Sequence, residues 1–148
     1  MSAIPRPALI LGLLGLIPFV AGAAGQLLGL SGTAPATVLA LYGAVILSFL
    51  GGTLWGFASP GPAAEDFGLM AVSVASSLLA FLALLSGAAD VALPLPLGML
   101  EVLALGFFLQ LLADRAFAAR ALVPAWWMSL RLPLSVVAIV CLLVGAYL

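Results

Sequence analysis

Charged residues are scarce in this 148-residue sequence, which has four basic residues, five acidic residues and no histidine. Apolar residues make up 66% of the chain, and the mean hydropathy is +1.41. A water-soluble domain needs many more polar groups to cover its surface. The composition therefore excludes a soluble globular protein.

Residue sets that bind metals or drive catalysis are also missing. With no histidine, one cysteine and no clustered carboxylates, zinc, haem and iron–sulfur sites are not expected, and we predict no cofactor. Cys141 lies inside an apolar run, where we interpret it as a small packed side chain, and a lone cysteine excludes an intramolecular disulfide. The sequence has no nucleophile elbow and no glycine-rich phosphate loop, so we do not expect an enzyme.

Long apolar runs are what the sequence does contain. An α-helix needs about 20 apolar residues to cross about 30 Å of hydrocarbon, and the short alternating runs of an outer-membrane barrel are missing. We predict an all-α, polytopic integral membrane protein, a compact bundle of five transmembrane helices over residues 7–30, 36–58, 67–86, 93–113 and 132–148. The longest connection, from Asp114 to Arg131, is too short for a second domain, so residues 1–148 are expected to form one domain.

The arginines predict the orientation of this bundle. With five crossings, Arg6, Arg115, Arg120 and Arg131 fall on one side of the membrane, and the opposite loops carry only Asp90. By the positive-inside rule we expect the arginine side and the N-terminus in the cytoplasm and the C-terminus outside. A count of four or six helices would divide the arginines between the two sides, so the charge pattern supports five.

The first span has an alternative interpretation. Arg6, the apolar stretch from Ala8 to Val20 and the small residues from Ala21 to Ala23 resemble a secretory signal peptide with its cleavage site. The apolar character continues past that site to Leu30 and favours a transmembrane helix.

Small residues and one proline predict close packing and bending. Every fourth residue along part of the second span is small, and together they form a ridge that a neighbouring helix can approach closely: Ala40, Ala44, Ser48, Gly52 and Gly56. We interpret this ridge as packing within the bundle, with self-association as the alternative. Pro18 lies inside the first span, where it removes a backbone hydrogen bond and predicts a kink.

One group of polar residues at membrane depth lies toward the side without arginines. Glu101 comes about 10 Å into the fourth span at about 1.5 Å per residue. Tyr42 of the second span lies at a similar depth, and Gln26 of the first span lies near the same end. We expect a buried site in which the Tyr42 hydroxyl reaches the Glu101 carboxylate. In such a site Glu101 is either a neutral structural acid or a carrier of a proton or cation.

A second polar group gathers at the arginine side. Its members lie at the ends of the second and fourth spans and at the start of the fifth: Trp55, Gly56, Gln110, Asp114, Arg115, Trp126, Trp127 and Arg131. Gln110 and Asp114 are four residues apart, so they share a helix face and are able to bond to each other. The group is either a binding site or an interfacial ion-pair cluster with a tryptophan belt that anchors the loop.

Several motifs of the chain together resemble a known family. They are Ile4 to Pro7 followed by Gly15 to Phe19, Tyr42 to Gly52 with Trp55 and Gly56, Gln110 to Arg115, and Pro124 to Trp126 with Arg131 to Pro133. They resemble the small membrane proteins catalogued as domain of unknown function 3429, whose eukaryotic relatives are called transmembrane protein 69-like. The resemblance implies a compact multi-pass protein of the bacterial inner membrane, or of the mitochondrial inner membrane in a eukaryote. It implies no activity, and Glu101 lies outside its motifs.

Three functions remain from these observations. We expect first a non-catalytic module that packs against or helps assemble a membrane complex, since the loops are short and small residues line the helices. The alternative is binding or transport of a small solute, lipid, quinone or proton at Glu101 or at the Gln110 and Asp114 pair. An intramembrane enzyme is least favoured. The expected partners are the lipid bilayer, another membrane protein or a second copy, and not nucleic acid.

Overall fold

The computed structural model describes residues 3–29, 34–88 and 97–148, and all regular structure in these ranges is helical. Five helical spans are long and apolar enough to cross a membrane, which confirms the predicted fold class: Arg6–Leu27, Pro35–Ala58, Phe67–Gly87, Met99–Ala119 and Trp127–Tyr147. The protein is therefore a helical membrane protein. Asp90 and Leu30 lie outside the described residues.

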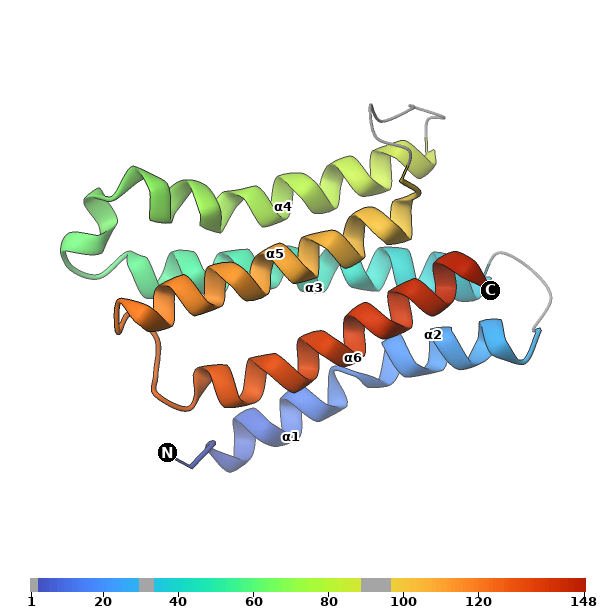
Figure 1. Cartoon of the computed structure of the whole chain (residues 1–148), viewed down its shortest axis with the longest axis horizontal. Coiled ribbons are helices and arrows are strands. Elements are labelled where there is room, and N and C mark those ends of the chain that lie inside the picture. The colour runs from blue at the N-terminus through green and yellow to red at the C-terminus, as the bar shows by residue number, and fades with distance from the viewer. Residues whose placement is uncertain (1–2, 30–33, 89–96) are drawn as a thin grey trace.

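The helices lie side by side along the long axis of the molecule (Figure 1). They are α1 (Arg6–Leu14), α2 (Ile17–Leu27), α3 (Ala34–Ala58), α4 (Phe67–Ala88), α5 (Met99–Ala119) and α6 (Trp127–Tyr147), with a short 3-10 helix η1 (Pro62–Glu65) before α4. Helix α4 forms one edge of the bundle, and α1 with α2 forms the opposite edge. Helices α3, α5 and α6 lie between these edges and supply most of the core.

The core is built where large side chains of one helix meet small residues of another. Leu39 and Leu47 of α3 are fully buried. A Cβ atom at Gly145 or at Gly106 would clash with these two leucines, so each glycine lets the neighbouring helix come close. The outward faces are apolar as well, as a lipid environment requires.

The first span is interrupted between α1 and α2. The two helices are separated by Gly15 and Leu16, and Pro18 lies in the first turn of α2, where a proline is tolerated. The Tyr42 hydroxyl donates a hydrogen bond to the Gly15 carbonyl oxygen at 2.9 Å. A carbonyl at the break thus has a partner inside the bundle, as the membrane interior demands.

The last two spans differ from the prediction in their bounds. Helix α5 begins later than predicted, at Met99, and continues past Asp114, while α6 begins before Arg131, so the long predicted loop shrinks to residues 120–126. The prediction ended both spans at a charged residue because isolated charges are costly in hydrocarbon. The structure keeps both residues within helices because their side chains pair with each other. Pro133 accordingly lies inside α6, beyond its first turn.

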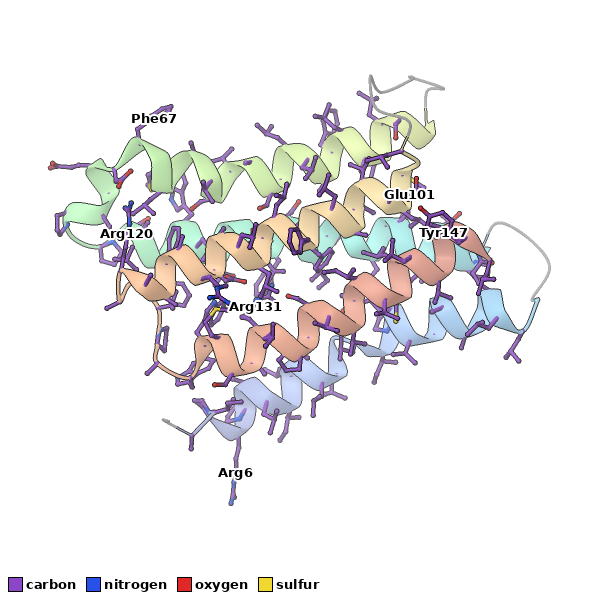
Figure 2. The ribbon with its side chains drawn as sticks, viewed as in Figure 1. Arg6, Phe67, Glu101, Arg120, Arg131 and Tyr147 are labelled. Carbon is purple, nitrogen blue, oxygen red and sulfur yellow. The ribbon has the colours of Figure 1, made fainter. Side chains whose placement is uncertain are left out.

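The arginines lie toward one end of the bundle, which we call the arginine end. Arg6, Arg120 and Arg131 are on this side of the molecule, and Glu101 and Tyr147 are at the opposite end (Figure 2). With five helical spans, these arginines lie at one end of the bundle, as predicted. The assignment of this end to the cytoplasm stays a prediction.

The predicted ridge on α3 does not keep to one buried face. Ala40 and Ala44 are buried, but Gly52 and Gly56 are exposed, and a Cβ atom at either glycine would meet nothing within 4 Å. A four-residue step turns about 40° too far on a helix of about 3.6 residues per turn, so the ridge winds out of the core. Gly51, one residue earlier, makes the close contact with α4 instead.

Candidate functional site

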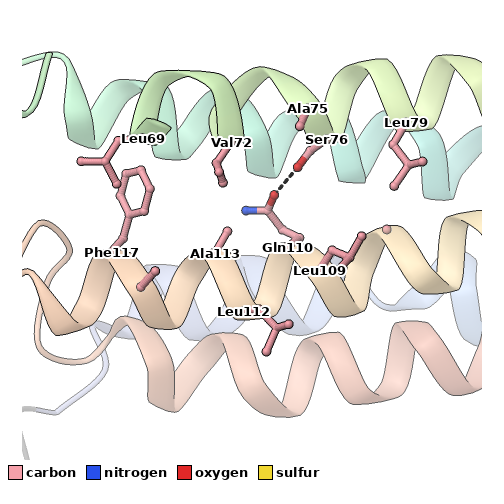
Figure 3. Close-up of a pocket in the computed structure, with 12 residues that line it drawn as sticks. Leu69, Val72, Ala75, Ser76, Leu79, Leu109, Gln110, Leu112, Ala113 and Phe117 are labelled. Atoms are coloured by element: carbon pink, nitrogen blue, oxygen red, sulfur yellow. Dashed lines mark hydrogen bonds between the residues drawn. The ribbon is translucent and has the colours of Figure 1, made fainter. Parts of the chain in front are cut away.

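Gln110 of α5 is buried, and only one of the two polar atoms of its side-chain amide has a hydrogen-bond partner among the described residues. It is 1% exposed, and its Oε1 accepts a hydrogen bond from the Ser76 hydroxyl of α4 (Figure 3). Its Nε2 is buried and has no hydrogen-bond partner among the residues that the structure describes. The predicted bond to Asp114 is not formed, because Gln110 turns toward α4 and Asp114 turns toward α6.

Gln110 lines a groove of about 380 Å³ between α4 and α5, which we call the Gln110 groove. Its lining is apolar except for Ser76 and Gln110. Leu69 and Phe117 lie at one end of the groove, and Leu79 lies toward the other (Figure 3).

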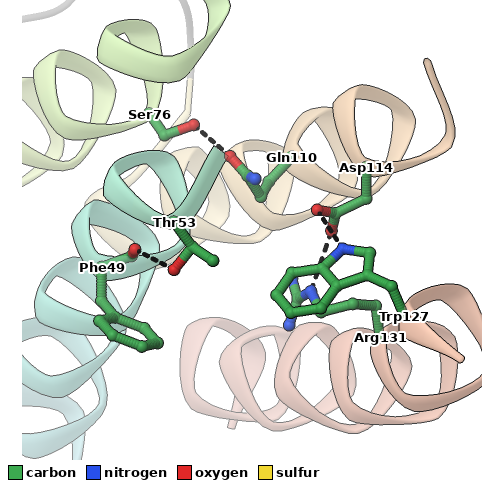
Figure 4. A network of polar contacts seen from close by, with 7 residues as sticks. All are labelled: Phe49, Thr53, Ser76, Gln110, Asp114, Trp127 and Arg131. Atoms are coloured by element: carbon green, nitrogen blue, oxygen red, sulfur yellow. Dashed lines mark hydrogen bonds and ion pairs between the residues drawn. The ribbon is translucent and has the colours of Figure 1, made fainter. Parts of the chain in front are cut away.

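Asp114 is fully buried, and α6 satisfies both of its carboxylate oxygens (Figure 4). Trp127 Nε1 donates to Oδ1 at 3.0 Å, and Arg131 Nε donates to Oδ2 at 2.9 Å. The Arg131 side chain is only 6% exposed. A hydrogen bond between a carboxylate and a guanidinium is strong. In an apolar interior, each of these two groups would be costly to bury without the other. We call these three residues the Asp114 cluster.

Local helix geometry explains how this cluster forms. Trp127 and Arg131 are four residues apart in α6, so both project from one face of that helix. The Trp127 ring packs edge-on against Phe57 of α3, with ring centroids 5.1 Å apart. Trp127 is thus a packed core residue with a specific partner for its N–H, and not a member of an interfacial belt.

Arg131 also faces a cleft of about 440 Å³, which we call the Arg131 cleft. Its lining comes from α1, α2, α3, α5 and α6 and includes Phe19, Leu130 and Arg131. The exposed side chains of Leu11 and Phe49 also line it, so it extends from the outer surface of the bundle to the Asp114 cluster. Arg131 Nη2 is buried and finds no hydrogen-bond partner within the described ranges.

Ser135 is the third buried polar residue of this region with a side-chain atom, its Oγ, that has no hydrogen-bond partner in the described part of the chain. It follows Arg131 by one turn of α6, and Gln110 precedes Asp114 by one turn of α5. Since α5 and α6 are antiparallel neighbours, Gln110 and Ser135 both lie on the deeper side of the Asp114 cluster. Buried polar atoms in proteins are nearly always hydrogen-bonded, so their accumulation here identifies the candidate site.

The remaining predicted members of this group lie outside the site. Trp55 is 45% exposed, and Gly56 and Arg115 also face outward. Trp126 is half-buried, and its ring centroid lies 5.9 Å from that of Trp127. Trp126 therefore supports the Asp114 cluster from its edge.

The predicted buried site around Glu101 is not formed. Glu101 is partly exposed in the first turn of α5, where its Oε2 accepts a hydrogen bond from the Gly98 backbone N–H at 2.6 Å. The Tyr147 hydroxyl also hydrogen-bonds to this carboxylate. The later start of α5 moves Glu101 from membrane depth to a helix N-terminus, where a carboxylate satisfies free N–H groups.

The two residues predicted beside Glu101 bond elsewhere. Tyr42 donates to the backbone at the break of the first span, as described above. Gln26 Nε2 donates to the Gly145 carbonyl oxygen at 3.3 Å, which ties α2 to α6. Both residues therefore hold helices together, and these two hydrogen bonds do not involve Glu101.

A second aspartate–arginine pair lies on the surface of the arginine end. Arg120 Nη1 is 2.6 Å from Asp66 Oδ2, and the Asp66 and Arg120 side chains are 40% and 56% exposed. Asp66 Oδ1 also accepts a hydrogen bond from the Leu69 backbone N–H at 3.1 Å, at the start of α4. The Arg120 hydrogen bond, with help from the Leu69 N–H, lowers the pKa of Asp66.

The sequence does not identify Ser76 and Ser135 as members of the site. Their only signal is a hydroxyl side chain inside an apolar run, and serines of this kind also bond to their own helix, as Ser73 does with the Leu69 carbonyl oxygen. In the described part of the chain, no three His, Cys, Asp or Glu side chains gather where they could hold a metal ion.

Comparison with known proteins identifies relatives along almost the whole chain. A family model described as "Protein of unknown function (DUF3429)" matches residues 4–147. Transmembrane protein 69 of Xenopus tropicalis is 42% identical over 142 residues, which cover 91% of this chain and 51% of the relative. The chain thus spans about half the length of that relative. No solved structure matches the chain.

Proposed function

This chain belongs to the DUF3429 family of proteins of unknown function, and we propose that it is a non-catalytic binding protein of the membrane. It holds an amphipathic, lipid-like molecule in the Arg131 cleft. The observation that carries the proposal is Arg131, which lines a cleft that reaches the outside of the bundle and whose buried Nη2 has no hydrogen-bond partner among the described residues.

The depth of Arg131 suits the polar end of such a molecule. Arg131 follows the first residue of α6 by four positions, which places it about 6 Å inside the helix end at about 1.5 Å per residue. Ester and carbonyl groups of membrane amphiphiles lie near this boundary, with their chains deeper. The apolar wall formed by Leu11, Leu130 and Leu134 would then surround the chain.

The head of the ligand is a neutral hydrogen-bond acceptor. Asp114 already balances the charge of Arg131 through its bond to Nε. An anion in the cleft would add an uncompensated negative charge at low dielectric, which is costly. A neutral carbonyl accepts from Nη2 without that penalty.

We place the protein in the bacterial inner membrane, or in the mitochondrial inner membrane of a eukaryote, with the arginine end toward the cytoplasm or matrix. The positive-inside rule supports this orientation. Fusion of a reporter to either terminus tests it.

Adjacent substitutions on α1 test the cleft. Ala8 lines the cleft, whereas its neighbour Leu9 is exposed and does not. Ala8→Phe fills the cleft, and Leu9→Phe adds the same ring on the outside. Neither substitution touches the Asp114 cluster, so folding should be preserved in both.

The measurement is the amount of ligand held by the purified full chain, read by native mass spectrometry. Short-chain diacylglycerol serves as the neutral probe, and phosphatidic acid with the same chains serves as the anionic one. We expect Ala8→Phe to lower diacylglycerol retention at least about tenfold, a change of about 1.4 kcal/mol, and Leu9→Phe to leave it unchanged. Equal retention in both variants contradicts the cleft, and preference for phosphatidic acid contradicts a neutral head.

A second candidate function is the assembly of a membrane complex with another membrane protein or a second copy. It rests on the exposed Gly52 and Gly56 of α3, which leave room for another helix backbone to approach. Gly52→Leu with Gly56→Leu should abolish any complex recovered in mild detergent without unfolding the bundle. A complex that survives both substitutions contradicts this candidate.

A further inference from the structure

We infer that the Gln110 groove is a second binding site, which takes a single apolar chain carrying a neutral hydrogen-bond acceptor, such as a carbonyl oxygen, at mid-membrane depth. This groove and the Arg131 cleft have no lining residue in common. They lie on different sides of α5, so the inference does not depend on the function proposed above.

The first argument is the unpartnered amide nitrogen of Gln110. Oε1 is held by the Ser76 hydroxyl, which fixes the amide so that Nε2 points into the groove (Figure 3). Nε2 carries two N–H donors, and it is buried without a partner among the described residues. In hydrocarbon no water satisfies such donors, so a ligand with an acceptor gains a hydrogen bond there that it does not have in the bilayer.

The second argument is depth. At about 1.5 Å per residue, Gln110 lies about 16 Å from Met99 and about 14 Å from Ala119, the two ends of α5. This is the middle of a hydrocarbon core about 30 Å thick. Ester groups of membrane lipids lie near the boundaries, so the acceptor must belong to a molecule that carries a polar atom within its apolar part.

The third argument is width. The groove extends along α4 from Leu69 to Leu79, a distance of about 15 Å. A volume of about 380 Å³ spread over that length makes the groove long and narrow. This shape suits one extended chain, which enters from the lipid past the exposed Val72 and Leu112.

The test uses two probes that differ only in the acceptor. One is a symmetrical long-chain ketone with a ¹³C-labelled carbonyl at the middle of the chain, and the other is the n-alkane of the same length. The purified full chain is titrated with each probe in nanodiscs, and isotope-edited infrared spectroscopy follows the ketone. The labelled carbonyl band moves to lower frequency when the oxygen accepts a hydrogen bond.

Three variants separate the hydrogen bond from the shape of the groove. Gln110→Leu removes the donor. Ala75→Phe fills the groove from α4, and Val74→Phe places the same ring on a neighbouring exposed position that does not line it. If Gln110→Leu fails to fold, the pair at positions 74 and 75 still tests the site.

We expect the wild-type chain to bind the ketone at least about tenfold more tightly than the alkane and to shift its carbonyl band. Gln110→Leu should abolish both the preference and the shift. Ala75→Phe should abolish binding of both probes, and Val74→Phe should behave as wild type. Equal binding of ketone and alkane by the wild type, or an unchanged band shift in Ala75→Phe, overturns the inference. Loss of diacylglycerol retention in Ala8→Phe with normal ketone binding would separate the two sites.

Discussion

Two aspartate–arginine pairs at the arginine end have the same chemistry and different surroundings. Asp66 and Arg120 are 2.6 Å apart on the surface, and Asp114 and Arg131 are 2.9 Å apart in the core. The exposed pair is the shorter, but water and salt screen it, so its contribution is small. The buried pair is not screened in this way, and either partner alone would be an uncompensated charge in an apolar medium. Burial, and not distance, decides which pair the fold depends on.

The largest expected effect comes from breaking the buried pair. Asp114→Asn keeps the shape of the side chain but leaves the Arg131 guanidinium without a counter-charge. We expect the free energy of unfolding to fall by about 3–5 kcal/mol, measured by SDS titration of the protein in mixed micelles. Asp66→Asn, the matched change at the surface pair, should have a much smaller effect.

A double substitution shows whether the loss is due to the orphaned charge. Asp114→Asn combined with Arg131→Met removes both charges, and part of the lost stability should return. If the double variant is as unstable as the sum of both single variants, the pairing argument is wrong.

A smaller effect is expected from Trp127, which donates a hydrogen bond to Asp114. Trp127→Phe removes the N–H that donates to Oδ1 and keeps an aromatic ring against Phe57. We expect a loss of about 1–3 kcal/mol in the same SDS titration, since a donor to a charged buried group is lost. Trp126→Phe is the control, because Trp126 makes no described bond to Asp114, and it should be near neutral. Equal losses in both variants would assign the effect to packing.

The number of spans and the arginine end were predictable because both are local properties of the chain. Apolar runs of about 20 residues and the spacing of Arg6 and Arg120 can be read without knowing which helices touch. The end of α5 and the start of α6 were not predictable in this way. They depend on the pairing of Asp114 with Arg131, seventeen positions later, and pairing across helices is a tertiary property.

The candidate site was predictable only in part, for the same reason. Gln110, Asp114 and Arg131 were identified because polar side chains at membrane depth need partners. Their separation into two cavities was not predictable, since a shared helix face does not determine which neighbouring helix each side chain contacts. Glu101 failed as a buried site because its depth was counted from a helix start that was placed too early.

Glu101 lies at the other end of α5, and we expect it to contribute less to stability than Trp127 does. Glu101→Ala removes the acceptor for the Gly98 N–H and for the Tyr147 hydroxyl. Because this end is partly exposed, water or lipid head groups replace those bonds. We expect Glu101→Ala to lower the free energy of unfolding in the same SDS titration, but by less than Trp127→Phe does. A decrease as large as that of Asp114→Asn would show that the bonds of Glu101 are shielded from water.

The smallest effect belongs to the surface pair, and pH reveals it. Arg120, followed by the Leu69 N–H, holds the pKa of Asp66 below its usual value, so the folded state favours the ionised carboxylate. The resulting stability is present above the usual pKa of an aspartate, about 4, and is lost as the pH falls through the lowered folded value. The difference in thermal midpoint between wild type and Asp66→Asn should therefore be measurable at about pH 6, shrink below about pH 4 and decrease in high salt. A difference that persists at acidic pH would mean that Asp66 acts through its shape at the start of α4, and not through its charge.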